Sequence, residues 1–190
     1  MLEKKMRLFE QTQVSIKNLT REIVMRPQTD TDKAYHEAAH AVADTRFGCH
    51  PVKASIKPSE GTLGSVSSLD GWDDSETARN YVISCLAGYV TEIRLDSSNE
   101  QAARLGASRD FEMASKPLEQ LNMDLQSGIA IAKEWVNRSE NWKAIELVAQ
   151  ELLIHEELVG DEIETLVVIA DGEATRETLA SVRLIQRLNR

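Results

Sequence analysis

The residues best suited to chemistry form one short run, His36-Glu37-Ala38-Ala39-His40. In a helix, residues four positions apart lie on one face, so both imidazoles can reach the same metal ion. Neutral imidazole is a good zinc ligand, and zinc lowers the pKa of a bound water to about 7. Glu37 stands beside the histidines and can accept the proton of that water. The run therefore predicts a zinc site with Glu37 as general base.

A helix must hold this run, and the flanking sequence predicts one. The segment 29–32, Thr-Asp-Thr-Asp, offers several N-cap oxygens, and Gly48 suits the left-handed conformation that ends many helices. The small residues on this helix are Ala34, Ala38, Ala39, Ala41 and Ala43. Small side chains allow other helices to approach the metal closely.

A catalytic zinc site has three protein ligands and an open position, so one ligand is still required. Asp110 follows residues 106–108 near the start of a predicted helix, where the positive end of the helix dipole stabilises an ionised carboxylate. Glu60 is the alternative, but it lies in a turn between Pro58 and Gly61. Asp110, near a helix start, is therefore a better candidate for the third ligand than Glu60 in its turn.

The remaining elements are predicted to be mostly helical, because apolar residues recur at intervals of three and four. Strand-like patterns at residues 52–57 and 62–67 flank a turn and predict one small β-hairpin. Residues 73–75 are expected to cap a helix that runs to about Leu95, and another helix start is expected near Ser108. Pro117 is expected to interrupt or kink that later helix. Gly128, Gly160 and Gly172 are candidate helix ends.

Length and pattern predict one domain with an appendage. A chain of 190 residues can form one full hydrophobic core but hardly two. Residues 1–27 carry a loose amphipathic helical pattern that stops before Pro27, so we expect an N-terminal arm there. Residues 28–190 are expected to form the metal-binding domain.

Composition excludes several classes of protein. The net charge of −9 repels nucleic acid and anionic membrane surfaces. No apolar run approaches the roughly 20 residues of a membrane helix, and the first residues lack a signal-peptide pattern. Cys49 and Cys85 have no partner at a zinc or redox spacing, so we expect reduced thiols. These features predict a soluble, cytoplasmic protein.

Taken together, the motifs resemble the peptidase domain of the FtsH-type zinc peptidases. Residues 34–41 (Ala-Tyr-His-Glu-Ala-Ala-His-Ala) resemble that family's zinc helix, and residues 51–58 with Leu63-Gly64 resemble its hairpin. Residues 86–92 (Leu-Ala-Gly-Tyr-Val-Thr-Glu) resemble its glycine-containing helix, and residues 106–110 its third-ligand motif. The match covers about residues 33–125. Residues 144–168 resemble the family's final helices more weakly.

The resemblance implies a mainly α, helical zincin with one small β-hairpin. His36, His40 and Asp110 would bind one Zn²⁺ per chain, Glu37 would be the general base, and Glu92 would orient a ligating histidine. His155 and His50 stand outside the motif and are expected to be structural or solvated. His155 lacks a second histidine four positions later.

The chain also departs from the family. Ala39 replaces a usual glycine, Tyr89 replaces a usual arginine, and Thr91 leaves only one of two usual acidic residues. The membrane helices and the ATPase phosphate loop of the family are lacking, so we expect a stand-alone form without unfolding power.

The expected function is ATP-independent hydrolysis of peptides or unfolded proteins, with the strand at residues 62–67 pairing with the extended substrate. One alternative is a binding or adaptor module that retains zinc and uses its N-terminal arm to dock a partner or a second copy. The other is a helical structural protein without metal.

Overall fold

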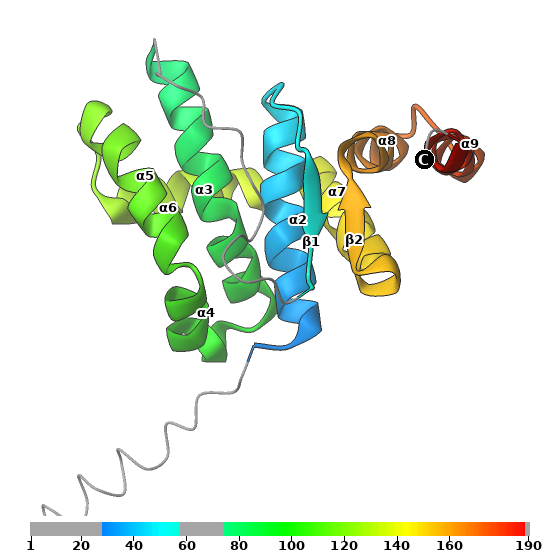
Figure 1. Ribbon diagram of the computed structural model, residues 1–190. Helices are drawn as coiled ribbons and strands as arrows, with labels where there is room; N and C mark the ends of the chain where they lie inside the picture. The colour runs from blue at the N-terminus through cyan, green and yellow to red at the C-terminus, as the bar shows by residue number, and fades with distance from the viewer. Residues whose placement is uncertain (1–27, 58–73, 189–190) are drawn as a thin grey trace, which may run out of the picture.

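The computed structural model of the protein describes residues 28–57 and 74–188 (Figure 1). This part is mainly helical and contains one small two-stranded sheet, which confirms the predicted fold class at that level. Three predicted features lie outside the described residues: the arm at residues 1–27, the strand at residues 62–67 and the alternative ligand Glu60.

The elements follow one another as α2 (Asp30–Arg46), β1 (Lys53–Ser55), α3 (Ser75–Leu95), the 3₁₀ turn η1 (Ser97–Asn99), α4 (Glu100–Gly106), α5 (Ser108–Gln120), α6 (Leu125–Val136), α7 (Ser139–His155), β2 (Glu157–Val159), α8 (Gly160–Asp171) and α9 (Arg176–Leu188). Helix α2 lies at the centre, between α3 and α7 (Figure 1). Helices α5 and α6 pack against α3, α8 packs against α7, and α9 packs against α8.

The alanines of α2 are what allow this central position. All five of them are buried: Ala34, Ala38, Ala39, Ala41 and Ala43. Because each contributes a single methyl group, the backbones of neighbouring helices can come close to α2 without steric conflict. The predicted close approach around the histidine motif is therefore confirmed.

The predicted bounds of α2 are also confirmed. Thr29 Oγ1 accepts a hydrogen bond from the Asp32 backbone N–H at 3.2 Å, and Asp32 Oδ2 accepts one from the Thr29 N–H at 2.7 Å. This reciprocal capping box stabilises the helix start by about 1 kcal/mol. At the other end, Phe47 caps the helix and Gly48 has a φ of +77°.

The starts of α3 and α5 lie where they were predicted. Asp74 Oδ1 accepts a hydrogen bond from the Thr77 N–H at 2.7 Å, and α3 ends at Leu95 as expected. Helix α5 begins at Ser108, yet its N-cap is Ala107, which has no polar side chain to offer. The predicted start near Ser108 is confirmed, and no side chain caps it.

Among the described residues, β1 pairs with a strand that the sequence did not predict. Lys53 pairs with Val159, Ala54 with Leu158 and Ser55 with Glu157 in an antiparallel ladder. Residues 157–159 were predicted to be helical. Glu156 ends α7 in a left-handed conformation with a φ of +61°, which turns the chain so that Leu158 enters the core beside Ala54.

Two of the three predicted glycine ends are wrong. Gly128 lies inside α6, where an added Cβ would stand 2.8 Å from Leu118, so close helix packing explains it. Gly160 begins α8 rather than ending a helix, and its missing Cβ leaves room for the Pro51 carbonyl. Gly172 ends α8 with a φ of +83°, as predicted. Pro117 lies within α5, which ends three residues later at Gln120.

The helices and the two cysteines were each the subject of a prediction from the sequence. Among the helices of residues 28–57 and 74–188, none has both the length and the apolar character to cross a bilayer. Cys85 is buried, Cys49 is partly exposed, and neither is in a disulfide. The latter finding agrees with the prediction of reduced thiols.

Candidate metal centre

The two motif histidines present the same ring nitrogen to a common point. His36 and His40 lie one turn apart on α2, with ring centroids 4.7 Å apart and the rings nearly perpendicular. Their Nε2 atoms are 2.9 Å apart. His36 is only 6% exposed, so its nitrogen is shielded from bulk water. The spacing of the motif therefore produces the predicted pairing.

Asp110 completes a group of three. From the first turn of α5, its Oδ2 lies 3.1 Å from His36 Nε2 and 3.6 Å from His40 Nε2. In the described part of the chain, these three side chains form the group of His, Cys, Asp or Glu residues that could hold a metal ion. Ligands about 2.0–2.2 Å from a tetrahedral zinc ion are about 3.3–3.6 Å apart. The observed separations are close to one face of such a tetrahedron.

The opposite ring nitrogens are both engaged by hydrogen bonds. His36 Nδ1 lies 2.6 Å from Glu92 Oε1, and His40 Nδ1 lies 2.7 Å from the Ser84 carbonyl oxygen. A carbonyl oxygen can only accept, so His40 Nδ1 carries the proton. Gln28 Nε2 donates to the same Glu92 oxygen at 3.1 Å. These partners fix both rings with Nε2 directed at the shared point, as partners of metal-binding histidines usually do.

Sequence reasoning found Glu92 but missed Ser84 and Gln28. Glu92 was identified through a family motif. The structure contains its predicted contact with a histidine, which is His36. Ser84 acts through its backbone carbonyl, which every residue type possesses, so its side chain gave no signal. Gln28 lies just before the Thr29 N-cap of α2 and belongs to none of the motifs recognised in the sequence.

The electrostatics of the group favour a cation. Burial alone would lower the pKa of His36, but hydrogen bonds to Asp110 and Glu92 outweigh it and raise that pKa to about 10. Burial opposes ionisation of Asp110, yet hydrogen bonds from His36 and His40 hold its pKa below the usual value. Three electron-rich atoms thus converge, and either protons or a metal ion must offset their repulsion.

The raised pKa of His36 gives a pH prediction for the protein kept metal-free with a chelator. Its contribution to stability is fully present below the unfolded pKa of about 6.5 and is lost as pH rises toward 10. Between these values, we expect wild type to lose at least about 1 kcal/mol more unfolding free energy than His36→Gln. Urea denaturation at a series of pH values measures this difference. Parallel stability profiles for the two proteins would refute it.

Gly88 of α3 forms the wall beneath the two rings. A Cβ added there would lie 2.6 Å from His40 Nε2 and 2.7 Å from His36 Cδ2, closer than real Cβ contacts. The glycine in the family-like segment 86–92 therefore has a steric reason to be a glycine. Any larger residue must push at least one imidazole away from the shared point.

We expect Gly88→Ala to weaken Zn²⁺ binding at least about tenfold, because displaced ligands bind less tightly. Competition with a chromophoric chelator measures the affinity. Alanine has a helix propensity about 1 kcal/mol better than that of glycine, so loss of metal would not reflect a weaker α3. Wild-type affinity in this variant would mean that the rings do not need the space above Gly88.

Glu37 is buried on α2 between the two ligating residues and is 6% exposed. Burial raises its pKa, while attraction to His40 and His36 partly offsets the effect and repulsion from Asp110 adds to it. Glu37 directly follows His36 on α2, and the charges of the metal group act on its carboxyl group. A carboxyl group with a raised pKa is suited to accept a proton near neutral pH.

The other two histidines lie outside the group. His50 Nδ1 contacts Glu164 Oε1 at 2.6 Å on an exposed surface, and its side chain is 84% exposed. His155 ends α7, and its Nε2 lies 3.5 Å from Glu151 Oε2. Both placements agree with the structural or solvated roles that were expected.

The three departures from the family motif also have defined surroundings. Ala39 is fully buried in the core. Tyr89 stacks edge-on against Phe111 with centroids 5.1 Å apart, and its hydroxyl donates to Glu100 Oε1 at 3.1 Å. Thr91 is buried, and its hydroxyl has no hydrogen-bond partner among the described residues. None of these three side chains belongs to the metal group.

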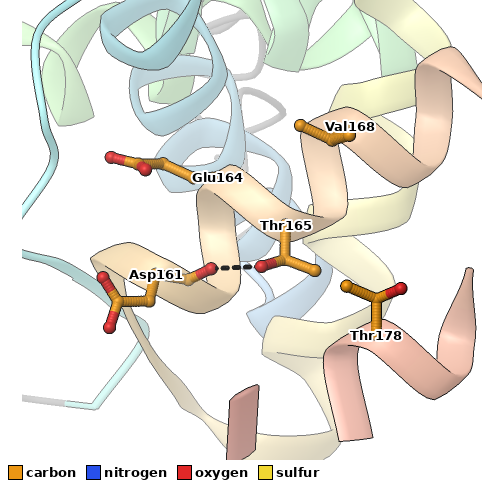
Figure 2. Close-up of a pocket in the computed structure, with 5 residues that line it drawn as sticks. All are labelled: Asp161, Glu164, Thr165, Val168 and Thr178. Carbon is orange, nitrogen blue, oxygen red and sulfur yellow. Dashed lines mark hydrogen bonds between the residues drawn. The ribbon is translucent and has the colours of Figure 1, made fainter. Parts of the chain in front are cut away.

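An open pocket lies away from this centre, between α8 and α9 (Figure 2). Its lining residues are Asp161, Glu164, Thr165, Val168 and Thr178. Thr165 Oγ1 donates to the Asp161 carbonyl oxygen at 2.6 Å, so this hydroxyl is used within the helix. With no histidine or cysteine in its lining, the pocket offers no match to the chemistry of the metal group.

The site is thus a candidate centre for one metal ion, formed between two helices by two histidines and a carboxylate. A comparison of the chain with models of known protein families found no match.

Proposed function

We propose that this protein is a zinc-dependent peptidase that hydrolyses peptide bonds of peptides or unfolded proteins. The observation that carries the proposal is the convergence of His36 Nε2, His40 Nε2 and Asp110 Oδ2, with Glu37 on the same helix as the two histidines. Two imidazoles and one carboxylate form a ligand set typical of catalytic zinc, and they leave a coordination position open.

In this mechanism His36, His40 and Asp110 would hold the metal, and Glu92 and the Ser84 carbonyl keep the imidazoles oriented. When bound, zinc supplies the Lewis acidity that makes a water nucleophilic near neutral pH and polarises the scissile carbonyl. Glu37 accepts the proton of the attacking water and delivers it to the nitrogen of the leaving amine. Burial of Glu37 supports this role by raising its pKa toward the working range.

We further propose that the fold is that of the FtsH-type peptidase domain. The zinc helix α2, the glycine-containing helix α3 and the ligand-bearing helix α5 occur in the order of that family's motifs, which supports the relationship. The proposed substrates are peptides and protein segments that are already unfolded.

A binding module that retains zinc is the second candidate. Its specific support is the burial of the centre: His36 and Glu37 are each 6% exposed, which limits the access of a substrate to the metal. In that case the metal would stabilise the packing of α2, α3 and α5, and the protein would act by association.

The test uses the full chain, purified and loaded with zinc. Elemental analysis should give one zinc per chain, and the protein should cleave an unfolded protein substrate. A chelator should abolish cleavage, and added Zn²⁺ should restore it. Zinc without cleavage would support the binding module, and absence of zinc would reject both candidates.

A further inference from the structure

Beyond the groups that contact the histidines, α2 carries a buried acid with no part in the proposed chemistry. Asp44 lies one turn after His40 on the same helix and is 5% exposed. The residues just before it, at positions 41–43, are alanine, valine and alanine. Burial of a carboxylate is costly unless it is hydrogen-bonded, so its position within an apolar stretch requires a partner.

The partner of Asp44 is Ser84, which is also the residue that holds His40. Ser84 Oγ donates a short hydrogen bond to Asp44 Oδ1, and Ser84 is 3% exposed. The carbonyl oxygen of the same residue accepts the His40 Nδ1–H at 2.7 Å. A single residue of α3 is therefore bonded to α2 at two points one helical turn apart.

These two bonds fix the position of α3 along α2. Removal of the Asp44 bond would leave the Ser84 carbonyl free to shift relative to His40, because van der Waals packing against alanines constrains sliding weakly. Burial raises the pKa of Asp44, and the Ser84 hydroxyl and the nearby His40 offset part of that rise, which agrees with the contacts.

We infer that Asp44 and Ser84 are a positioning pair, which holds the Ser84 carbonyl where it orients the His40 ring and so sets how tightly the site binds a divalent metal. This inference rests on the proposed metal site, but it does not depend on peptidase activity. Both residues act through another group, since neither side chain is among the metal ligands.

The test measures Zn²⁺ affinity by chelator competition and the visible absorption of Co²⁺, which reports ligand geometry. We expect Ser84→Ala and Asp44→Ala each to weaken Zn²⁺ binding by about 10–100-fold and to alter the Co²⁺ spectrum. The double variant should lose no more than either single variant, because all three lack the same bond. Asp44→Asn retains an oxygen that accepts from Ser84 and should remain close to wild type.

A structural control separates positioning from general destabilisation. Asn141 is buried on α7 and donates to the Trp135 carbonyl at 2.8 Å, far in sequence from the metal group. Asn141→Ala should lower the unfolding midpoint and leave Zn²⁺ affinity unchanged. If Asp44→Ala does not fold, Asp44→Asn compared with Asp44→Asn/Ser84→Ala provides the same contrast.

Three possible results support or overturn the positioning pair. Weaker metal binding in Ser84→Ala and Asp44→Ala, with rescue in Asp44→Asn, supports the positioning pair. Wild-type affinity in Ser84→Ala and Asp44→Ala overturns the pair while leaving the proposed function intact. A wild-type protein that binds neither Zn²⁺ nor Co²⁺ overturns the metal site, and the positioning pair with it.

Discussion

Glu37→Gln is expected to reduce peptide hydrolysis at least about a hundredfold while zinc content stays near one per chain. Glutamine keeps the size and helix propensity of the side chain but cannot accept a proton at neutral pH. Because the ligands are His36, His40 and Asp110, the metal should be unaffected. The measurement is paired: zinc by elemental analysis and cleavage of an unfolded protein substrate, on both proteins.

The matched control is Glu119→Gln, the same substitution at an exposed position of α5. It should cleave like wild type, so that a loss in Glu37→Gln reports the base and not a change of net charge. Equal cleavage by Glu37→Gln and wild type would exclude the proposed mechanism. If neither protein cleaves although both hold zinc, the binding module becomes the better account.

The features that sequence predicted well depend on local information. The bounds of α2 could be predicted because Thr29, Asp32 and Gly48 act on their own helix ends. The facing of His36 and His40 follows from helical periodicity alone. Asp110 required one further step, the preference of a carboxylate for a helix start, and that step also uses only neighbouring residues.

The features that were missed depend on contacts between distant segments. Strand β2 has three residues, and its conformation follows from pairing with Lys53–Ser55, about a hundred positions earlier. Gly128 resembles a helix end in sequence, but its reason for being glycine is the proximity of Leu118 and Leu86. The Ser84 carbonyl holds His40 through a backbone atom, which no residue pattern can reveal. In each case the deciding interaction is tertiary.

Glu92 was predicted from resemblance to a family, and only the structure gives the physical reason for its role. Glu92 could be associated with the site only through resemblance, because nothing in its own surroundings on α3 distinguishes it from an ordinary helical glutamate. The structure supplies the physical reason: Glu92 is 4% exposed and accepts hydrogen bonds from both His36 and Gln28. A buried carboxylate with two donors stabilises a cationic centre beside it, whether the positive charge is a proton or a metal.

Removal of any one ligand is expected to have the largest effect on metal binding. Changes at groups that only orient a ligand typically cost about 10–100-fold in affinity, so loss of a ligand itself should cost more. We expect His36→Ala, His40→Ala and Asp110→Ala each to lose zinc during gel filtration in buffer without metal. In each variant two protein ligands remain where three atoms met within 4.8 Å of one another.

Elemental analysis after gel filtration measures this loss, with His50→Ala as the matched control. His50 is an exposed histidine bound to Glu164, so its removal should leave one zinc per chain. Circular dichroism shows whether each variant keeps its helices, which separates metal loss from unfolding. If Asp110→Ala retains zinc like wild type, Asp110 is not the third ligand, and Glu60 becomes the residue to replace next. If His40→Ala retains it as well, the ion is bound elsewhere, because two of the three proposed ligands would then each be dispensable for binding at this point.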